Sequence, residues 1–423
     1  MTPETKEISI LDPGNGMFNT HVYLEDVQKV IKEQLSTEAQ LGENTKYTVI
    51  GDGNGFMSRV ILVDADWTVP DEKLPKRFVL KISSVLHIQT MIENMVKANP
   101  ETFSPELEAQ LWALFENESK MLHNREVAVY KLLEKWNRKT DLLHPDMYFS
   151  VKFDEKNPLK GFMGMELVES AKTRHIYENL KPEDLYPVLK TLATLQSLSL
   201  TMADEEVKSI EGYTFKKLMG SILDDNGIKN IFLSTIAIDK CLTEKCEKMM
   251  EIGVKLIDVD MTDNLNEEVG IEKNVLVHGD LWTANLLFVN KNGVEVIDKV
   301  IDYQLVHMGN PAEDLVRLFL SSLSGADAKN RWEELLEKFY EYLKEEMQGN
   351  KMPYTLEQLK QSYKLFYTSA GIVMFQMFGP VAQQKFSYLD PSEAEKYRGV
   401  LIEKADHLLD EMDKYYNYRI NRK

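Results

Sequence analysis

The segment HGDLWTANLLF, residues 278–288, combines residue types that can carry out one particular chemistry. Asp280 can accept the proton of a hydroxyl nucleophile, and Asn285 can offer an amide oxygen to a metal ion. The order His, one residue, Asp, four residues, Asn is the spacing of a kinase catalytic loop, H-R-D-x-x-x-x-N, with Gly279 in place of arginine. Apolar residues on both sides indicate short buried strands, so we expect a rigid loop that positions these side chains.

A second aspartate is needed if this loop is to work with a metal-bound nucleotide. Strands at 288–289 and 294–301, joined by a turn at 290–293, are predicted to bring Asp302 back beside the catalytic loop. Asp298 is the rival metal ligand. We favour Asp302 because it directly follows an apolar pair, whereas a lysine follows Asp298.

Near the N-terminus, candidate strands at 47–50 and 59–63 flank a glycine-rich segment. Backbone N–H groups in such a segment can approach phosphates, because glycine has no Cβ to obstruct them. The candidate nucleotide-binding residues here are Gly53, Asn54, Gly55 and Ser58. The match to G-x-G-x-x-G is imperfect because Phe56 takes the place of the third glycine, and a plain hairpin turn is the alternative reading.

Apolar and polar residues alternate at 77–82, near the end of which Lys81 lies. In kinases a strand lysine likewise follows the glycine-rich loop in the sequence. Lys81 is therefore a candidate partner for the α- and β-phosphates of a nucleotide, although a single strand lysine is usually only solvated. Its ion-pair partner should lie on a following helix. The periodic stretch 124–133 offers Glu126, with Glu118 as the second choice.

Taken together, the stretches HGDLWTANLLF and VIDYQLVHMGNPAEDLVRL resemble the choline/ethanolamine and aminoglycoside phosphotransferase superfamily. They are most similar to its ecdysteroid-kinase-like branch, the CHK kinase-like proteins. The resemblance implies a bilobal protein-kinase-like fold, use of ATP and Mg²⁺, and transfer of the γ-phosphoryl group to a hydroxyl of a small molecule. It also implies an acceptor such as an ecdysteroid, another steroid-like alcohol or a glycoside, with choline or ethanolamine as the alternative.

Residue by residue, the resemblance implies that Asp280 is the catalytic base and that Asn285 and Asp302 bind Mg²⁺. Asp314 would be a buried aspartate that braces the loop. A strand at 161–168 would lead to a hinge. The resemblance alone places the adenine at that hinge, against the backbone of Glu166 and Leu167.

We therefore expect an α+β protein with a small antiparallel-sheet N-lobe, residues 1–168, and a large, mainly helical C-lobe, residues 169–423. A helical insertion is expected before residue 133. In the C-lobe the sequence predicts helices at 312–324, 328–346, 355–378 and 392–417.

Composition agrees with a cytoplasmic enzyme that acts on a small molecule. The net charge of −18 disfavours nucleic acid and anionic membranes as partners, because both require a basic surface. Cys241 and Cys246 are the two cysteines, so a disulfide framework is not expected. The uncharged stretch 365–384 contains Gly379-Pro380, and we interpret it as a buried helix that ends near Phe378, with no membrane insertion.

Several features have less specific interpretations. We expect His278 to be structural, hydrogen-bonded to backbone near Asp302, and His307 could be structural or functional. The acidic stretch 258–268 lacks the register of a calcium loop and is expected to be solvated. The Phe and Met side chains within 365–378 are expected to be core residues, although part of that face could line a cleft for an apolar acceptor.

Two other functions were weighed. A protein kinase is disfavoured because Pro311-Ala312-Glu313 follows Asp302 too closely for a protein-kinase activation segment. A catalytically inactive protein that only binds ligands is disfavoured because Lys81, Asp280, Asn285 and Asp302 are all present. The oligomeric state is not indicated by any motif.

Overall fold

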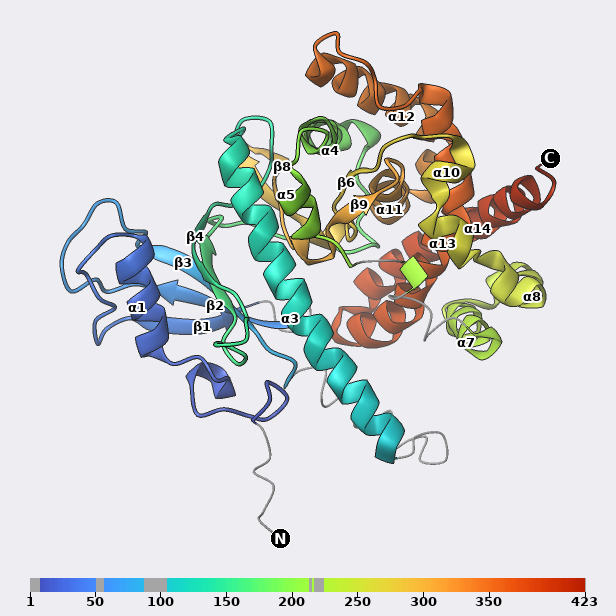
Figure 1. Ribbon diagram of the computed structural model, residues 1–423. Coiled ribbons are helices and arrows are strands. Elements are labelled where there is room, and N and C mark those ends of the chain that lie inside the picture. The colour runs from blue at the N-terminus through green and yellow to red at the C-terminus, as the bar shows by residue number, and fades with distance from the viewer. Residues whose placement is uncertain (1–7, 51–56, 87–104, 213–214, 217–223, 423) are drawn as a thin grey trace. The chain divides into compact units, whose positions relative to one another are not determined.

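Contacts divide the chain of the computed structural model into two units, which are described separately. One unit comprises residues 1–135 and 145–169, and the other comprises 136–144 and 170–423. The structure describes residues 8–50, 57–86, 105–212, 215–216 and 224–422 (Figure 1).

The first unit is built on a five-stranded antiparallel sheet with the order β1-β2-β3-β5-β4. Its strands are β1 (Lys46–Ile50), β2 (Ser58–Asp64), β3 (Arg77–Ser83), β4 (Met147–Val151) and β5 (Phe162–Glu166). The predicted strands around the glycine-rich segment and at Lys81 are therefore confirmed.

The two faces of this sheet have different roles. The apolar side of α1 (Leu24–Gln34), with Val27 and Ile31, packs into one core with Phe78, Leu80 and Ile82 of β3 (Figure 1). Side chains alternate between the faces of a strand, so Lys81 lies on the opposite face. The helix α3 (Pro105–Trp136) supplies the ion-pair partner of Lys81 there.

Two short antiparallel pairs in the second unit hold the polar loop 278–285 in place. The strand β6 (Val275–Val277) pairs with β9 (His307–Gly309), and β7 (Leu286–Lys291) pairs with β8 (Val294–Val300). The β7–β8 turn is formed by Asn292 and Gly293, with φ of 57° and 85°. Positive φ at both positions is the geometry that an Asn-Gly turn favours, and the predicted hairpin is confirmed.

Helices make up most of the second unit, and α13 is the central one. The helices are α4 (Tyr186–Ser199), α5 (Asp204–Lys208), α7 (Asp225–Ile236), α8 (Thr243–Ile252), α9 (Val259–Asp263), α10 (Leu265–Val269), α11 (Glu313–Ser322), α12 (Gly325–Met347), α13 (Leu356–Pro380) and α14 (Pro391–Ile420). α13 packs against α7, α11, α12 and α14 (Figure 1). Within this core Trp332 and Tyr363 stack with ring centroids 4.7 Å apart.

The uncharged part of α13 is mostly a core helix, with Met377 half-buried. Phe366, Met374, Phe375 and Phe378 are at most 3% exposed. The helix does not stop near Phe378, as the sequence had suggested, but continues through Pro380 into a π-helical turn at Val381–Lys385. By length and hydropathy the segment 356–388 passes the test for a membrane span, but 72% of its apolar window is buried inside the structure.

The predicted α+β class, with an antiparallel sheet and a mainly helical remainder, is confirmed. Residues 136–144, which the sequence analysis assigned to the N-lobe, contact the helical unit instead. The reason is local bonding: the Leu143 carbonyl accepts from the Val300 N–H, and the Asp141 carboxylate pairs with Lys190. The division at 168/169 into separate domains stays a prediction.

Candidate active site

The loop between β6 and β7 has a backbone conformation that explains its glycine. Gly279 has a φ of +79°, and a Cβ at this position would lie 2.2 Å from the Leu305 carbonyl oxygen. A side chain is therefore excluded, and the arginine of the H-R-D pattern has no space here. Asn285 donates from Nδ2 to both the carbonyl oxygen (2.8 Å) and the Oδ2 atom (3.1 Å) of Asp280. The two predicted catalytic-loop residues are thus brought together.

His278 is structural, as predicted. It is 1% exposed, and its Nε2–H donates to the Ile301 carbonyl oxygen at 3.1 Å while Nδ1 accepts from the Asp280 N–H at 3.3 Å. Burial lowers the pKa of His278 to about 4, so the ring is neutral. The histidine ties the loop to the end of β8 and carries no proton in the reaction.

Asp302 follows β8 and adopts a left-handed backbone conformation, with φ 70° and ψ 60°. A residue other than glycine in this region costs roughly 1–2 kcal/mol and often marks a functional position. Its negative charge is one of the causes that raise the pKa of Asp280, so the two carboxylates are close enough to interact. The rival residue, Asp298, instead pairs with Lys291 across the hairpin at 2.7 Å.

Asp314 holds the start of the catalytic loop from the first turn of α11. Its side chain is 1% exposed and accepts hydrogen bonds from the His278 N–H (2.7 Å) and the Gly279 N–H (3.0 Å). Burial raises the pKa of Asp314 to about 6, although these two backbone donors act in the opposite direction. The arrangement matches the bracing role that the family resemblance implied for this residue.

One turn further along the same helix lies Arg317, a residue that the sequence analysis missed. Its Nη1 donates to the Gly279 carbonyl oxygen at 2.6 Å, and its Nη2 pairs with Oδ1 of Asp280 at 2.6 Å. Burial raises the pKa of Asp280 to about 6, and the guanidinium of Arg317 opposes that increase. The spacing of three residues from Asp314 on a helix was the available signal, because residues i and i+3 lie on one face.

In the first unit, Lys81 and Glu126 form the predicted ion pair. The Lys81 Nζ lies 2.8 and 2.7 Å from the two carboxylate oxygens of Glu126, whose side chain is 2% exposed. The partner is thus Glu126 and not Glu118. Such a pair, on a strand and a following helix, is the arrangement by which kinases present a lysine to nucleotide phosphates.

The remaining nucleotide-binding candidates are only partly described. Gly53, Asn54 and Gly55 lie outside the described residues, while Ser58 begins β2 opposite Ser83. Glu166 ends β5, and its side chain accepts from the Asp146 N–H at 3.0 Å. Leu167 follows directly and is half-buried. Their roles toward adenine or phosphate stay predictions.

A family model covers nearly the entire chain. The model of DUF1679, described as "Uncharacterized oxidoreductase dhs-27", matches residues 10–420. The chain belongs to this family. One of the two relatives below is described as kinase-like, in agreement with the resemblance that the motifs indicated.

Two relatives from Caenorhabditis elegans have been described by name. The chain is 24% identical over 330 residues to "Uncharacterized oxidoreductase dhs-27", which covers 76% of this chain and 38% of that protein. It is 24% identical over 183 residues to "Uncharacterized kinase-like protein D1044.1", which covers 43% of this chain and 46% of that protein. Each alignment therefore spans less than half the length of the relative.

Solved structures that align with the chain include a choline kinase from Cryptosporidium parvum, with a TM-score of 0.48, 15% identity and coverage of 94% of this chain and 97% of that one. A putative aminoglycoside phosphotransferase from Ralstonia eutropha aligns with a TM-score of 0.45, 11% identity and coverage of 92% and 98%.

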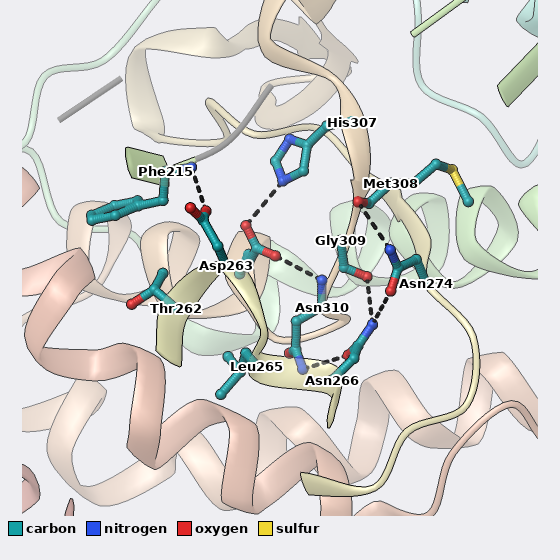
Figure 2. Close-up of a pocket in the computed structure, with 11 residues that line it drawn as sticks. Phe215, Thr262, Asp263, Leu265, Asn266, Asn274, His307, Met308, Gly309 and Asn310 are labelled. Atoms are coloured by element: carbon teal, nitrogen blue, oxygen red, sulfur yellow. Dashed lines mark hydrogen bonds and ion pairs between the residues drawn. The ribbon is translucent and has the colours of Figure 1, made fainter. Parts of the chain in front are cut away.

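This protein also contains a polar pocket next to the catalytic loop. Its lining includes Asp263, Asn266, His307 and Gly309, which Figure 2 shows, and Glu313. His307 is the cross-strand neighbour of Val277, the residue before His278. The Nδ1 atom of His307 lies 3.1 Å from the position that a Gly279 Cβ would take. Pocket and catalytic loop therefore share a wall.

Proposed function

We propose that this protein is a phosphotransferase that moves the γ-phosphoryl group of ATP to a hydroxyl of a small molecule. The observation that carries the proposal is the set of bonds around Asp280. Arg317 fixes one carboxylate oxygen and Asn285 the other, while Asp314 fixes the backbone on the N-terminal side. Because both carboxylate oxygens are held in place, Asp280 is oriented to align a hydroxyl nucleophile and to accept its proton.

The chain's own groups support the protonation state that this role requires. With a pKa of about 6, Asp280 is mostly ionised at pH 7 and above and can take the hydroxyl proton as the bond to phosphorus forms. Arg317 keeps that carboxylate charged in spite of its burial. Asp302 adds a second negative charge close by, which favours a cation at this place.

The donor set fits the magnesium ion that the family resemblance implies. Asn285 and Asp302 would hold it through their side-chain oxygens, which suits a hard cation that takes one or two carboxylates and completes its coordination with water and phosphate. When bound, the metal neutralises charge on the phosphate oxygens. In the first unit Lys81, kept in place by Glu126, would pair with the α- and β-phosphates. We also propose that Gly53, Asn54, Gly55 and Ser58 approach the phosphates, and that Glu166 and Leu167 approach the adenine.

For the acceptor, a hydroxyl-rich compound such as a glycoside is better supported than a steroid-like alcohol. Most of the apolar wall expected from 365–378 is buried, since Phe366, Met374 and Phe375 lie in the core and Met377 is half-buried. The described pocket beside the loop is lined mainly by polar groups. Choline is disfavoured because a quaternary ammonium prefers several aromatic faces, and Phe215 is the one Phe, Tyr or Trp among the described lining residues.

The word oxidoreductase in the description of one relative suggests a second class of function. A nicotinamide-binding domain of the usual kind needs a parallel sheet with a phosphate-binding turn. Every strand pair that the structure describes is antiparallel. The fold of the described residues therefore favours phosphoryl transfer, and we propose a cytoplasmic enzyme without a nucleic-acid partner.

The direct test is incubation of the purified full chain with ATP, Mg²⁺ and a metabolite extract, followed by mass spectrometry for products that gain one phosphoryl group. The matched control is Asp280→Asn, which keeps the shape of the side chain. We expect phosphorylated products with the unchanged protein and none with the variant. Equal product formation by both proteins would rule out the assigned base, and acceptor-dependent reduction of added NAD in place of phosphorylation would favour the oxidoreductase class.

A further inference from the structure

Lys404 lies near the middle of α14, and its amino group is buried at the end of another helix. The residue is 2% exposed. Its Nζ donates to the carbonyl oxygens of Ser321 (2.6 Å) and Ile176 (2.5 Å). Ser321 belongs to the last turn of α11, where carbonyl groups lack partners within the helix and the helix dipole favours a cation. Lys404 thus joins the end of α11 to the segment 170–180.

The burial of Lys404 is costly, because a lysine gives up its hydration when it leaves water. Burial accordingly lowers the pKa of Lys404 to about 7, while the charge of Glu403 acts in the opposite direction. The ammonium form carries three N–H donors and the neutral amine carries two, so both forms can donate to both carbonyl oxygens. An apolar side chain would fill the space at lower cost. The two hydrogen bonds therefore explain why a lysine stands here.

The end of α11 that Lys404 contacts is itself bonded to the catalytic loop. The Thr283 N–H donates to Ser321 Oγ at 3.3 Å, and the hydroxyl oxygens of Thr283 and Ser322 lie 3.1 Å apart. These three residues are 0% exposed, so water cannot replace the bonds if they open. Thr283 begins a single 3₁₀-helical turn that ends at Asn285. The contact therefore holds the chain directly before Asn285.

The segment 170–180 supports the chain on the other side of Asn285. Lys172 and Phe288 exchange two backbone hydrogen bonds, of 2.9 and 2.8 Å. Phe288 lies in β7, which begins directly after Asn285. Ile176, the second acceptor of Lys404, belongs to the same segment. Lys404 thus fastens together the two supports that hold the residues before and after Asn285.

We propose that Lys404 is a positioning residue that keeps the side chain of Asn285 in place for metal binding. It acts on Asn285 through Thr283 on one side and Phe288 on the other. The metal-binding part rests on the proposed phosphotransferase function, whereas the positioning of the loop does not.

The contacts of α11 with the catalytic loop should have separable effects. Arg317, in the middle of the helix, acts on the charge of Asp280, whereas Lys404 secures the end of the helix and thereby the position of Asn285. Without Lys404 the loop should loosen and not unfold, because the Leu180 N–H donates to the end of α11 at 2.7 Å and joins the same two supports. We therefore expect loss of Lys404 to raise the Mg²⁺ requirement and to leave the acid limb of the pH profile near pH 6.

The first test is amide hydrogen exchange of the full chain without nucleotide, measured at the peptide that contains Thr283. Lys404→Met keeps most of the side-chain volume and removes the donors. We expect exchange there to become about 3–10-fold faster, the equivalent of one hydrogen bond of typical strength. Lys404→Gln keeps two N–H donors and should give an intermediate rate, and it replaces the methionine variant if that protein does not fold.

Leu408→Ala is the matched control, because Leu408 is also buried on α14 and its side chain makes no hydrogen bond. This variant should lower the melting temperature but leave exchange at Thr283 within about twofold of the unchanged protein. Equal exchange in the Lys404→Met and Leu408→Ala variants would overturn the proposal, as would a glutamine variant that exchanges as fast as the methionine variant.

The second test measures kcat across a series of Mg²⁺ concentrations, at a temperature equally far below each melting temperature. Lys404→Met should raise the Mg²⁺ concentration for half-maximal rate by about 3–10-fold, and Leu408→Ala should not change it. Faster exchange at Thr283 without a change in this concentration would overturn the link to Asn285. Faster exchange only in the Lys404 variants, with no turnover even by the unchanged protein, supports the positioning and counts against the phosphotransferase. Turnover with unaltered exchange has the opposite meaning.

Discussion

At the scale of single residues, the orientation and the pKa of Asp280 are set by three neighbouring residues. Asn285 contacts its carbonyl oxygen and Oδ2, Arg317 contacts Oδ1, and the charge of Asp302 acts over a longer distance. Replacing the carboxylate should therefore lower the reaction rate and also remove the ion pair with Arg317.

We expect Asp280→Asn to lower kcat by about 10²–10⁴-fold, the usual contribution of a general base. Asparagine has the same shape, so the affinity for ATP should stay close to that of the unchanged protein, whereas the melting temperature should fall because Arg317 loses its ion-pair partner. Turnover measured beside thermal unfolding and nucleotide titration checks this. A near-normal rate with the true acceptor would remove Asp280 from its assigned role.

Replacing Arg317 should change the pH dependence of the reaction. The base must be ionised, and the guanidinium lowers the pKa of Asp280, so Arg317→Met should raise that pKa by about 1–3 units. The acid limb of the profile of log kcat/KM then moves from near pH 6 toward higher pH, and the rate at pH 7 falls. Arg317→Lys keeps the charge and should shift the limb less. A limb that does not move would mean that Arg317 only supports the loop.

At the scale of elements, the β7–β8 hairpin favours Asp302 over Asp298 as the proposed metal ligand. Its register pairs Leu286 with Val300, which leaves Asp302 just beyond the strand and Asp298 beside Lys291. The sequence predicted the hairpin but not this register: the turn expected at 290–293 is a two-residue turn at 292–293, and the pairing shifts between Leu287 and Phe288.

We therefore expect Asp302→Ala and Asn285→Ala to raise the Mg²⁺ concentration needed for half-maximal rate by about 10-fold or more. Asp298→Ala should change it little, because the carboxylate of Asp298 is engaged by Lys291. Rates measured across a series of Mg²⁺ concentrations, with chelator as the metal-free reference, provide the comparison. If Asp298→Ala had the larger effect, the assignment of the metal ligands would be wrong.

The β3–α3 pair of the first unit carries a separate prediction. Lys81→Ala should weaken ATP binding or slow transfer, and Glu126→Gln should have the same effect in milder form, because it leaves the lysine in place without its partner charge. Fluorescence titration with a nucleotide analogue measures the first effect and single-turnover kinetics the second. Glu118→Gln is the control and should behave like the unchanged protein.

Helices show where sequence reasoning succeeds and where it stops. The periodicity of 312–324 located α11, and the motif around Asp314 indicated which side chain faces the loop. Arg317 escaped notice because an arginine on an amphipathic helix usually lies on its solvated side. The apolar face within 365–378 was correctly taken as core. Which of its side chains are fully covered could not be predicted, since that depends on how α7 and α14 pack against the helix.

At the scale of the whole molecule, net charge opposes the approach of an anionic nucleotide. The chain carries 68 acidic and 50 basic residues, a charge of −18. Long-range repulsion is screened by salt within about 10 Å at 0.1 M ionic strength, whereas close contacts such as the one to Lys81 are screened less.

We therefore expect the association rate of a fluorescent ATP analogue to rise when ionic strength is increased from about 0.01 to 0.1 M. Stopped-flow mixing at constant free Mg²⁺ measures this rate. Ethylene glycol, which is uncharged, should show no such dependence in its binding. A nucleotide association rate that falls with added salt would show that local positive charge dominates the field at the site.

The pocket is lined on one side by α9 and α10 and on another by the start of α11, and these sides differ in how freely they can change. Glu313 belongs to the short helix that also carries Asp314 and Arg317, so its backbone cannot shift without disturbing the base. Asp263 and Asn266 lie on α9 and α10, where Asp263 bonds to the amides of Phe215 and Lys216. Substitutions on the α9–α10 side can therefore reshape the pocket without moving Asp280, whereas substitutions at the start of α11 cannot.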